Sequence, residues 1–116
     1  MGGWFILGMA AAFPDRRQAS ASLHGTHLIS EEKDSPHLLV KRLKGELYCR
    51  WGALDHLSPT EIAKKFAELL KSCSVKYSSN LHLGVEHGYA LPDRAYTVNR
   101  RLKLIEKQFL KCLIVN

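Results

Sequence analysis

Short runs that resemble buried strands alternate with helical patterns along this chain, and this alternation constrains the fold more than any other feature. The runs lie at 18–23, 46–53 and 75–83. The first two have the small or apolar content of strands inside a sheet, and the third alternates loosely. Strands that alternate with helices favour a parallel sheet with right-handed crossovers. We therefore expect an α/β fold with about three parallel strands and flanking helices.

The first and last segments of the chain both predict helices. The run from Gly2 to Phe13 is apolar nearly all round and stops at Pro14, which is typical of a helix buried on most of its sides. The apolar residues of 96–113 recur at spacings of four and three. That spacing predicts an amphipathic closing helix.

A third helix is predicted between the second and third strands. Ser58 is suited to cap it, Pro59 to occupy its first position and Glu61 its third. The apolar residues of 62–73 then fall on one helical face. The segment 26–44 has no clear periodicity, so we expect a surface excursion there.

The composition is that of a globular protein with one domain, 1–116. The chain has 116 residues, of which 46% are hydrophobic and 24% charged, which suits a modest core. The net charge of +6 would suit a nucleic acid. However, the basic residues near the C-terminus fall on the polar face of the closing helix, with no aromatic platform beside them. We expect no nucleic-acid partner.

The cysteine and histidine spacings predict neither a disulfide framework nor a metal site. Cys49, Cys73 and Cys112 form no C-x-x-C pair and leave an odd number. His24 and His27 lack a second pair of ligands. We expect no metal and no cofactor, and a reducing cytoplasm is the simplest setting.

The apolar run at 4–13 imitates the core of a signal peptide. It lacks the positive charge that normally precedes such a core. Its ten residues are also about half of what a membrane-spanning helix needs. We therefore interpret this run as part of a buried helix and expect a cytoplasmic protein with no membrane partner.

Two polar residues follow predicted strands and point to proton-transfer chemistry. Asp55 comes just after the 46–53 strand, and His87 lies just after the 75–83 strand in a turn bracketed by glycines. The carboxyl ends of parallel strands share one edge of the sheet, where functional groups gather. A carboxylate that orients an imidazole makes the imidazole an effective general base. The order acid then histidine matches the last two members of an α/β-hydrolase triad.

A series of short motifs spans most of the chain. The motifs are Met1-Gly2-Gly3, Ala12-Phe13-Pro14-Asp15-Arg16, Leu23-His24-Gly25, Asp34-Ser35-Pro36-His37-Leu38-Leu39, Leu54-Asp55-His56, Val85-Glu86-His87-Gly88-Tyr89, Pro92-Asp93-Arg94 and Tyr96. In combination they resemble the C-terminal half of the dienelactone hydrolase family, a branch of the α/β-hydrolases. The resemblance implies a partial α/β-hydrolase fold, with Asp55 as triad acid and His87 as triad base. The backbone N–H of Met1 would correspond to an oxyanion-hole donor.

The resemblance also shows where this chain departs from the family. Family members carry a nucleophile elbow, Gly-x-Cys-x-Gly-Gly or its serine form, and Met1-Gly2-Gly3 matches only the residues after the nucleophile. Some members hold a substrate carboxylate with an arginine four residues after the histidine, where this chain has Leu91. The three cysteines lie within a strand or on apolar helix faces, where burial suppresses thiol reactivity. We therefore expect the nucleophile to lie before Met1 and the isolated chain to be inactive.

Two functions remain open at this point. The first is a carboxylic ester hydrolase that works by acyl transfer on a small ester or lactone once the missing half is supplied. The second is a non-catalytic remnant or interaction module. In the family fold further strands would lie beside the 18–23 strand, so here that strand becomes a sheet edge able to pair with another chain or form a homo-oligomer.

Overall fold

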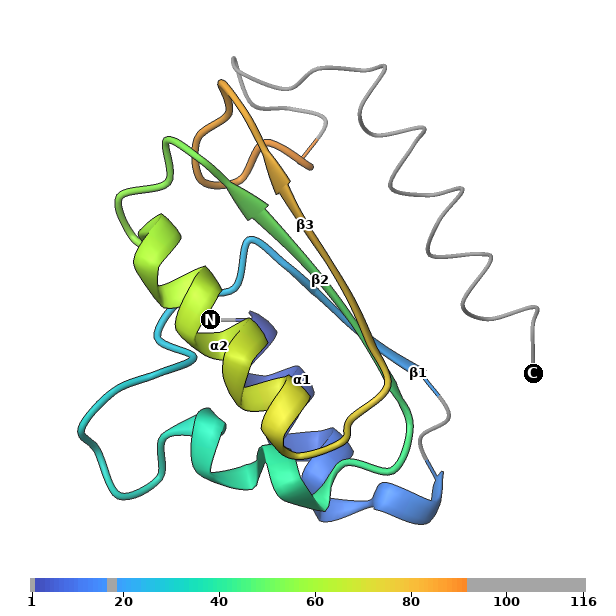
Figure 1. The fold of residues 1–116 in the computed structure, drawn as a ribbon. Coiled ribbons are helices and arrows are strands. Elements are labelled where there is room, and N and C mark those ends of the chain that lie inside the picture. Colours follow the sequence, from blue (N-terminus) through green and yellow to red (C-terminus); the bar gives the residue numbers. More distant parts are fainter. Residues whose placement is uncertain (1, 17–18, 92–116) are drawn as a thin grey trace.

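A computed structural model describes residues 2–16 and 19–91, which are built on a three-stranded parallel sheet with helices packed on one face (Figure 1). The strands are β1 (Ala19–Leu23), β2 (Glu46–Gly52) and β3 (Tyr77–His82), in the order β1-β2-β3. The prediction of three parallel strands with flanking helices is confirmed. The predicted helix at 96–113 lies outside the described residues.

β2 is the central strand, and its side chains alternate between the two faces of the sheet. Leu47, Cys49 and Trp51 point to the face that carries the main hydrophobic core, and all three are buried. Tyr48 and Arg50 therefore point to the opposite face and are buried as well. β2 is thus covered on both sides, as the middle strand of a parallel sheet should be.

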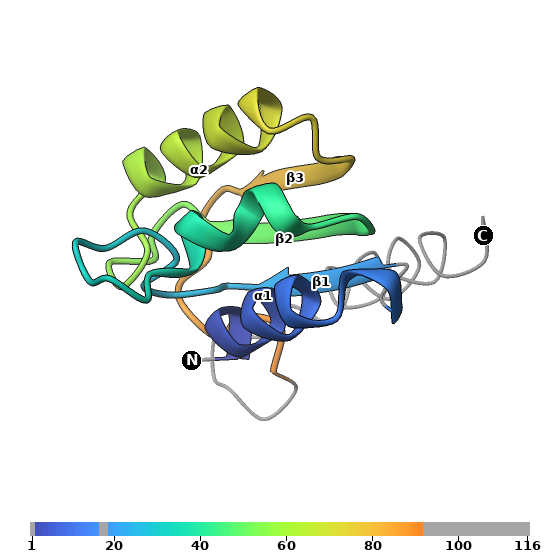
Figure 2. The ribbon, with the colours of Figure 1, turned by 90° about the horizontal axis from the view of Figure 1, so that it is seen from below.

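The helices of the structure are α1 (Gly2–Ala12), η1 (Pro14–Arg16), η2 (Pro36–Arg42) and α2 (Thr60–Ser72), of which η1 and η2 are 3₁₀ helices. α1 contacts β1 and η2, whereas α2 contacts η2, β2 and β3 (Figure 2). Leu7 of α1, Val40 of η2 and Phe66 of α2 share one cluster with the core residues of β2. α1, η2 and α2 thus cover a common face of the sheet.

The outer side of α1 is exposed, which corrects the prediction of a helix buried on most of its sides. Leu7, Ala10 and Ala11 pack inward. Phe5 and Met9 are 57% and 46% exposed. An apolar pattern that runs all round a helix does not say which side faces the core, and in this molecule β1 and η2 cover only one side.

The start of α2 also differs from the prediction. The helix begins at Thr60 with Pro59 as its N-cap, and the Ser58 side chain makes no capping hydrogen bond. Asp55 Oδ1 instead accepts the backbone N–H groups of Leu57 and Ser58, at 2.9 and 3.2 Å. This turn places the Ser58 hydroxyl in the interior, where it has no hydrogen-bond partner among the described residues.

The segment 26–44 contributes to the core and is more than a surface excursion. Leu28 and Val40 are both almost fully buried. Val40 belongs to η2, whose 3₁₀ geometry has three residues per turn and so escapes a search for the α-helical period. Within this segment, the longest continuous exposed run is the stretch 31–34, as predicted for a surface excursion.

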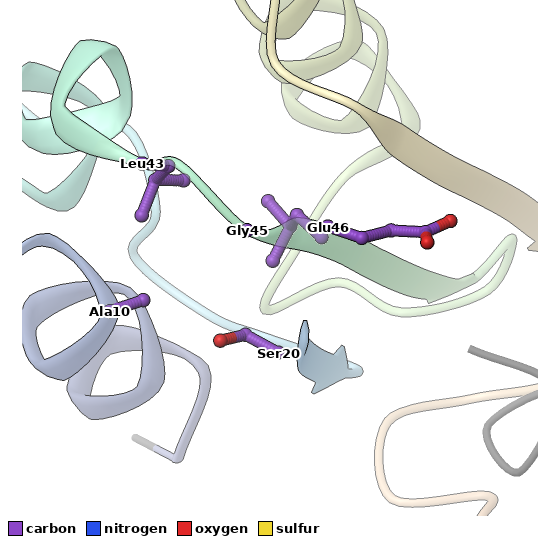
Figure 3. A pocket seen from close by; sticks show the side chains of 6 residues that line it. Ala10, Ser20, Leu43, Gly45 and Glu46 are labelled. Carbon is purple, nitrogen blue, oxygen red and sulfur yellow. The ribbon is translucent and has the colours of Figure 1, made fainter. Parts of the chain in front are cut away.

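A small cavity of about 10 Å³ lies at the amino ends of β1 and β2. Ala10 of α1 and Ser20 of β1 point into it, while the Glu46 carboxylate points away (Figure 3). This volume is at the lower limit for one water molecule. It is a packing gap, and the functional groups lie at the other end of the strands.

Candidate active site

The loops that follow β2 and β3 are hydrogen-bonded to each other at the carboxyl edge of the sheet. The N–H of Ala53 donates to the His82 carbonyl at 2.9 Å, and the N–H of Leu54 donates to the Val85 carbonyl at 3.0 Å. A Cβ atom at Gly52 would lie only 2.7 Å from the Val85 oxygen, so glycine permits this approach. These contacts fix the loop that carries His87 against the loop that carries Asp55.

Glycines on both sides of His87 form the turn that presents it. Gly84 has φ +67° and Gly88 has φ +79°, a left-handed conformation that glycine adopts without strain. The predicted glycine-bracketed turn is therefore present. It carries the chain back from the end of β3 so that the His87 ring reaches Asp55.

Asp55 and His87 meet in a direct hydrogen bond of 2.8 Å between Asp55 Oδ2 and His87 Nδ1. The other carboxylate oxygen, Oδ1, accepts the two backbone N–H groups at the start of the α2 turn. The Asp55 side chain is 0% exposed, whereas that of His87 is 31% exposed. An ionised carboxylate accepts a hydrogen bond from Nδ1–H, so the neutral imidazole carries its proton on Nδ1 and keeps a free lone pair at Nε2. The pair therefore leaves Nε2 of a partly exposed side chain able to accept a proton.

A second histidine lies against this pair. The His24 ring centroid is 5.0 Å from that of His87 in an edge-to-face arrangement. Burial lowers the pKa of His24, a positive charge on His87 lowers it further, and the Asp55 carboxylate opposes both effects. His24 thus favours its neutral form beside His87.

The Tyr89 ring lies between those of His24 and His82 in a series of ring contacts. The Tyr89 ring is 5.8 Å from His24 and 5.3 Å from His82. His82 Nε2 in turn lies 3.0 Å from Nη1 of the buried Arg50, which also donates from Nε to the Tyr48 hydroxyl. Sequence reasoning missed the contacts of the His24 ring with His87 and Tyr89. The alternation of β2 was the available signal for Arg50, because it places Arg50 on the face opposite Cys49.

Other predicted groups fall as follows. Met1, the proposed oxyanion-hole donor, lies outside the described residues. Cys49 is buried in β2, and burial raises the pKa of its thiol to about 12, which makes it a poor nucleophile. Cys73 is partly buried at the C-cap of α2. Leu91 is 41% exposed.

Two negative findings apply to residues 2–16 and 19–91. No cluster of three or more histidine, cysteine or acidic side chains there could hold a metal ion. No helix in the same part of the chain is both long and apolar enough to cross a membrane.

Comparison of the sequence with family profiles finds one match. The profile described as "Dienelactone hydrolase family" covers residues 1–111. A comparison with curated protein sequences gives no match.

Comparison with solved structures finds hydrolases of the α/β class. A candidate dienelactone hydrolase from Klebsiella pneumoniae superposes with a TM-score of 0.83 at 17% identity, covering 94% of this chain and 46% of that one. Acylaminoacyl peptidase from Pyrococcus horikoshii gives 0.72 at 17% identity, covering 93% of this chain and 22% of that one. Esterase 2 from Thermogutta terrifontis superposes with a TM-score of 0.64 at 18% identity, covering 81% of this chain and 40% of that one. The fold is therefore a partial α/β-hydrolase fold, and the chain spans less than half the length of each of these proteins.

Proposed function

The chain belongs to the dienelactone hydrolase family, and from this premise we propose that it supplies the acid and base of a carboxylic ester hydrolase. The observation that carries the proposal is the 2.8 Å hydrogen bond between Asp55 and His87. Asp55 would orient the imidazole and stabilise its protonated form, and His87 would be the general base. The reaction would be acyl transfer on a small ester or lactone.

The direction of proton transfer follows from the hydrogen bonds of the pair. Because Nδ1 is committed to Asp55, Nε2 would accept the proton from the hydroxyl or thiol of a nucleophile as that atom attacks the ester carbonyl carbon. The same nitrogen would then return the proton to the departing alcohol, leaving an acyl-enzyme. Water, activated in turn by Nε2, would release the carboxylic acid.

We further propose that the nucleophile comes from outside these 116 residues. Cys49 of β2 is a poor candidate for the nucleophile, because it is buried and burial raises the pKa of its thiol. The structural relatives are each more than twice as long as the part that superposes on this chain, which leaves room in such a fold for a nucleophile elbow. The backbone N–H of Met1 would then serve as an oxyanion donor.

The test is to extend the chain at its amino end and follow the hydrolysis of p-nitrophenyl acetate. The extension is the segment encoded ahead of Met1 or, in its absence, the amino-terminal half of the Klebsiella relative. We expect turnover that falls by roughly 10³-fold or more in His87→Gln and in Asp55→Asn. The unextended chain should show no turnover that depends on His87.

His56→Gln is the matched control, because His56 is next to Asp55 but exposed. It should leave turnover unchanged. Equal losses in His56→Gln and His87→Gln, or full activity of the extended His87→Gln chain, would contradict the proposed role. His87-dependent turnover by the unextended chain would contradict an external nucleophile.

A second candidate function is binding to another copy of this chain through the β1 edge. β1 lies at the edge of the sheet, and neither α1 nor β1 contains a charged residue. Edge strands that avoid pairing normally carry charges or prolines. An uncharged edge beside an exposed apolar helix side therefore favours an interaction surface.

Sedimentation equilibrium of the wild type and Ala21→Pro tests this candidate. The N–H of His24 donates to the Arg50 carbonyl at 2.8 Å, so by alternation the N–H of Ser22 also faces β2 and that of Ala21 faces outward. Ala21→Pro removes one outward donor and leaves the β1–β2 ladder in place. A dimer that becomes monomeric supports the candidate, and a monomeric wild type rejects it.

A further inference from the structure

A cavity of about 280 Å³ lies between the first turn of α1 and the corner after β1. It is lined by Trp4 and Phe5 from α1 and by Thr26 and His27 from the corner. A cavity of about 150 Å³ holds a benzene molecule, and ligand sites begin near 300 Å³. This cavity therefore has room for an aromatic ring with a short linker.

The corner after β1 connects this cavity to His87. A Cβ atom at Gly3 would lie 2.9 Å from the Gly25 Cα, so the first turn of α1 and the corner touch at these two glycines. The cavity begins one residue further along each wall, at Trp4 and Thr26. His24 precedes Gly25 in the chain, and its ring packs edge to face against His87 with the centroids 5.0 Å apart.

The walls of this cavity suit an uncharged apolar group. The Trp4 and Phe5 rings meet edge to face at 5.2 Å, and none of the four lining residues is acidic, a lysine or an arginine. A neighbouring cavity of about 190 Å³, which also includes Trp4, carries Lys33 and Asp34 in its wall. A lysine and an aspartate therefore line the neighbouring cavity, whereas no lysine, arginine or acidic residue lines this one.

We propose that this cavity binds the uncharged aryl or arylalkyl part of the ester on which His87 acts. The inference rests on the proposed function and adds the substrate class to it. A carboxylate in this cavity would lose hydration, and no lysine or arginine lines the cavity to compensate for its charge. The exposed Leu91, at the position where the family resemblance would place a carboxylate-binding arginine, is in keeping with a neutral substrate.

The test measures binding of two probes to the 116-residue chain by ¹H–¹⁵N NMR. Phenylacetamide and phenylacetate share one ring and differ in charge. We expect phenylacetamide to shift the indole N–H signal of Trp4, identified by its loss in Trp4→Phe, and to bind about tenfold or more tightly than phenylacetate. The indole N–H signal of Trp51, whose N–H donates to Ser79 Oγ at 3.1 Å, should not shift.

Two variants of exposed phenylalanines provide the matched comparison. Phe5→Ala removes one wall of the cavity and should weaken phenylacetamide binding about fivefold. Phe13 is also exposed but lies beyond the far end of α1, so Phe13→Ala should leave binding unchanged. Phe5→Lys adds a cation at the wall and should reverse the preference in favour of phenylacetate.

The outcomes separate this inference from the proposed function. If neither probe shifts Trp4, if phenylacetate binds as tightly as phenylacetamide, or if Phe13→Ala weakens binding as much as Phe5→Ala, the cavity assignment is wrong even where the extended chain hydrolyses esters. If phenylacetamide binds as expected but the extended chain shows no His87-dependent turnover, the catalytic proposal is wrong and the binding site stands.

Discussion

α1 and α2 cover the same face of the sheet, yet their outer sides are opposite in character. α2 buries Ala63, Phe66 and Leu70 and presents a charged outer surface with lysines and glutamates. α1 contains no charged residue and exposes Phe5 and Met9. α2 is an amphipathic helix with a charged face toward solvent, whereas the outer side of α1 has the apolar composition of an interface.

This difference assigns different proposed roles to the two sides of the molecule. The α2 side supplies stability and, through the turn that precedes the helix, holds Asp55. The α1 side holds the uncharged β1 edge and the aromatic cavity, so it is the side on which a substrate or another protein segment would bind. The predictions below test this division.

The largest expected effect concerns one phenylalanine in each helix. Phe66 is 0% exposed, so Phe66→Ala should lower the free energy of unfolding by about 3–5 kcal/mol through the cavity it leaves. Phe5→Ala should change it by less than about 0.5 kcal/mol, because the side chain is mostly in solvent. Urea unfolding followed by circular dichroism measures both. Comparable losses in the two variants would show that α1 is as fully packed as α2.

The second prediction compares the inner and the outer side of α1 by the same glycine-to-alanine change at two positions. A Cβ at Gly3 would lie 2.4 Å from Ser22 Oγ and 2.9 Å from the Gly25 Cα, whereas a Cβ at Gly8 meets nothing within 4 Å. Gly3→Ala should therefore destabilise the protein by about 1–3 kcal/mol. Gly8→Ala should stabilise it by up to about 1 kcal/mol through helix propensity. Thermal unfolding of both variants measures the difference, and a stabilising Gly3→Ala would rule out the close contact of α1 with the corner.

The third prediction concerns pH and His24, at the α1 side of the site. Burial and the neighbouring His87 lower the pKa of His24 in the folded state. Below the unfolded value of about 6.5 the unfolded chain binds a proton that folded His24 resists, so stability falls as the pH falls. His24→Asn, which tolerates the left-handed φ of +43°, should make this fall shallower.

Urea midpoints at pH 8, 6 and 5 measure the effect of His24→Asn. The difference in stability between variant and wild type at pH 8, where His24 of the wild type is neutral in both the folded and the unfolded state, is the reference. The variant should lose less stability than the wild type between pH 8 and pH 5. Parallel curves would show that His24 titrates normally in the folded protein.

The smallest expected signal is the labelling of Cys49. This thiol lies under the helices with a pKa of about 12, so iodoacetamide at pH 8 should leave it unmodified in the native protein and label it in urea. Peptide mass spectrometry distinguishes it from the other cysteines. Gly3→Ala should speed the labelling if it lifts α1 from the sheet. Rapid labelling in the wild type would indicate that the helix layer opens readily.

Much of the fold could be predicted because burial determined the sequence patterns. β2 is covered on both faces, and so its apolar run was recognisable. Asp55 and His87 could be paired because both follow parallel strands, whose carboxyl ends must share an edge. The 2.8 Å hydrogen bond depends on that topology and on two loop glycines that were visible in the sequence.

The features that sequence missed depend on tertiary contacts. Serine is a common N-cap residue, so Ser58 was a reasonable candidate. In the structure, however, the backbone N–H groups of that turn donate to the Asp55 carboxylate. His24 adopts a left-handed φ that a non-glycine residue rarely shows, and this conformation turns its ring toward His87. One side of α1 is exposed because β1 and η2 cover only the other side. The apolar pattern around the whole helix does not show which side that will be.

Asp55 uses its two oxygens for two different purposes. One orients His87, and the other holds the turn that leads into α2. In a lineage that lost catalysis, selection on folding alone would still retain Asp55, while His87 would be free to drift. A comparison among descendants of this gene should therefore judge activity by the fate of His87, because a retained Asp55 records only the survival of the fold.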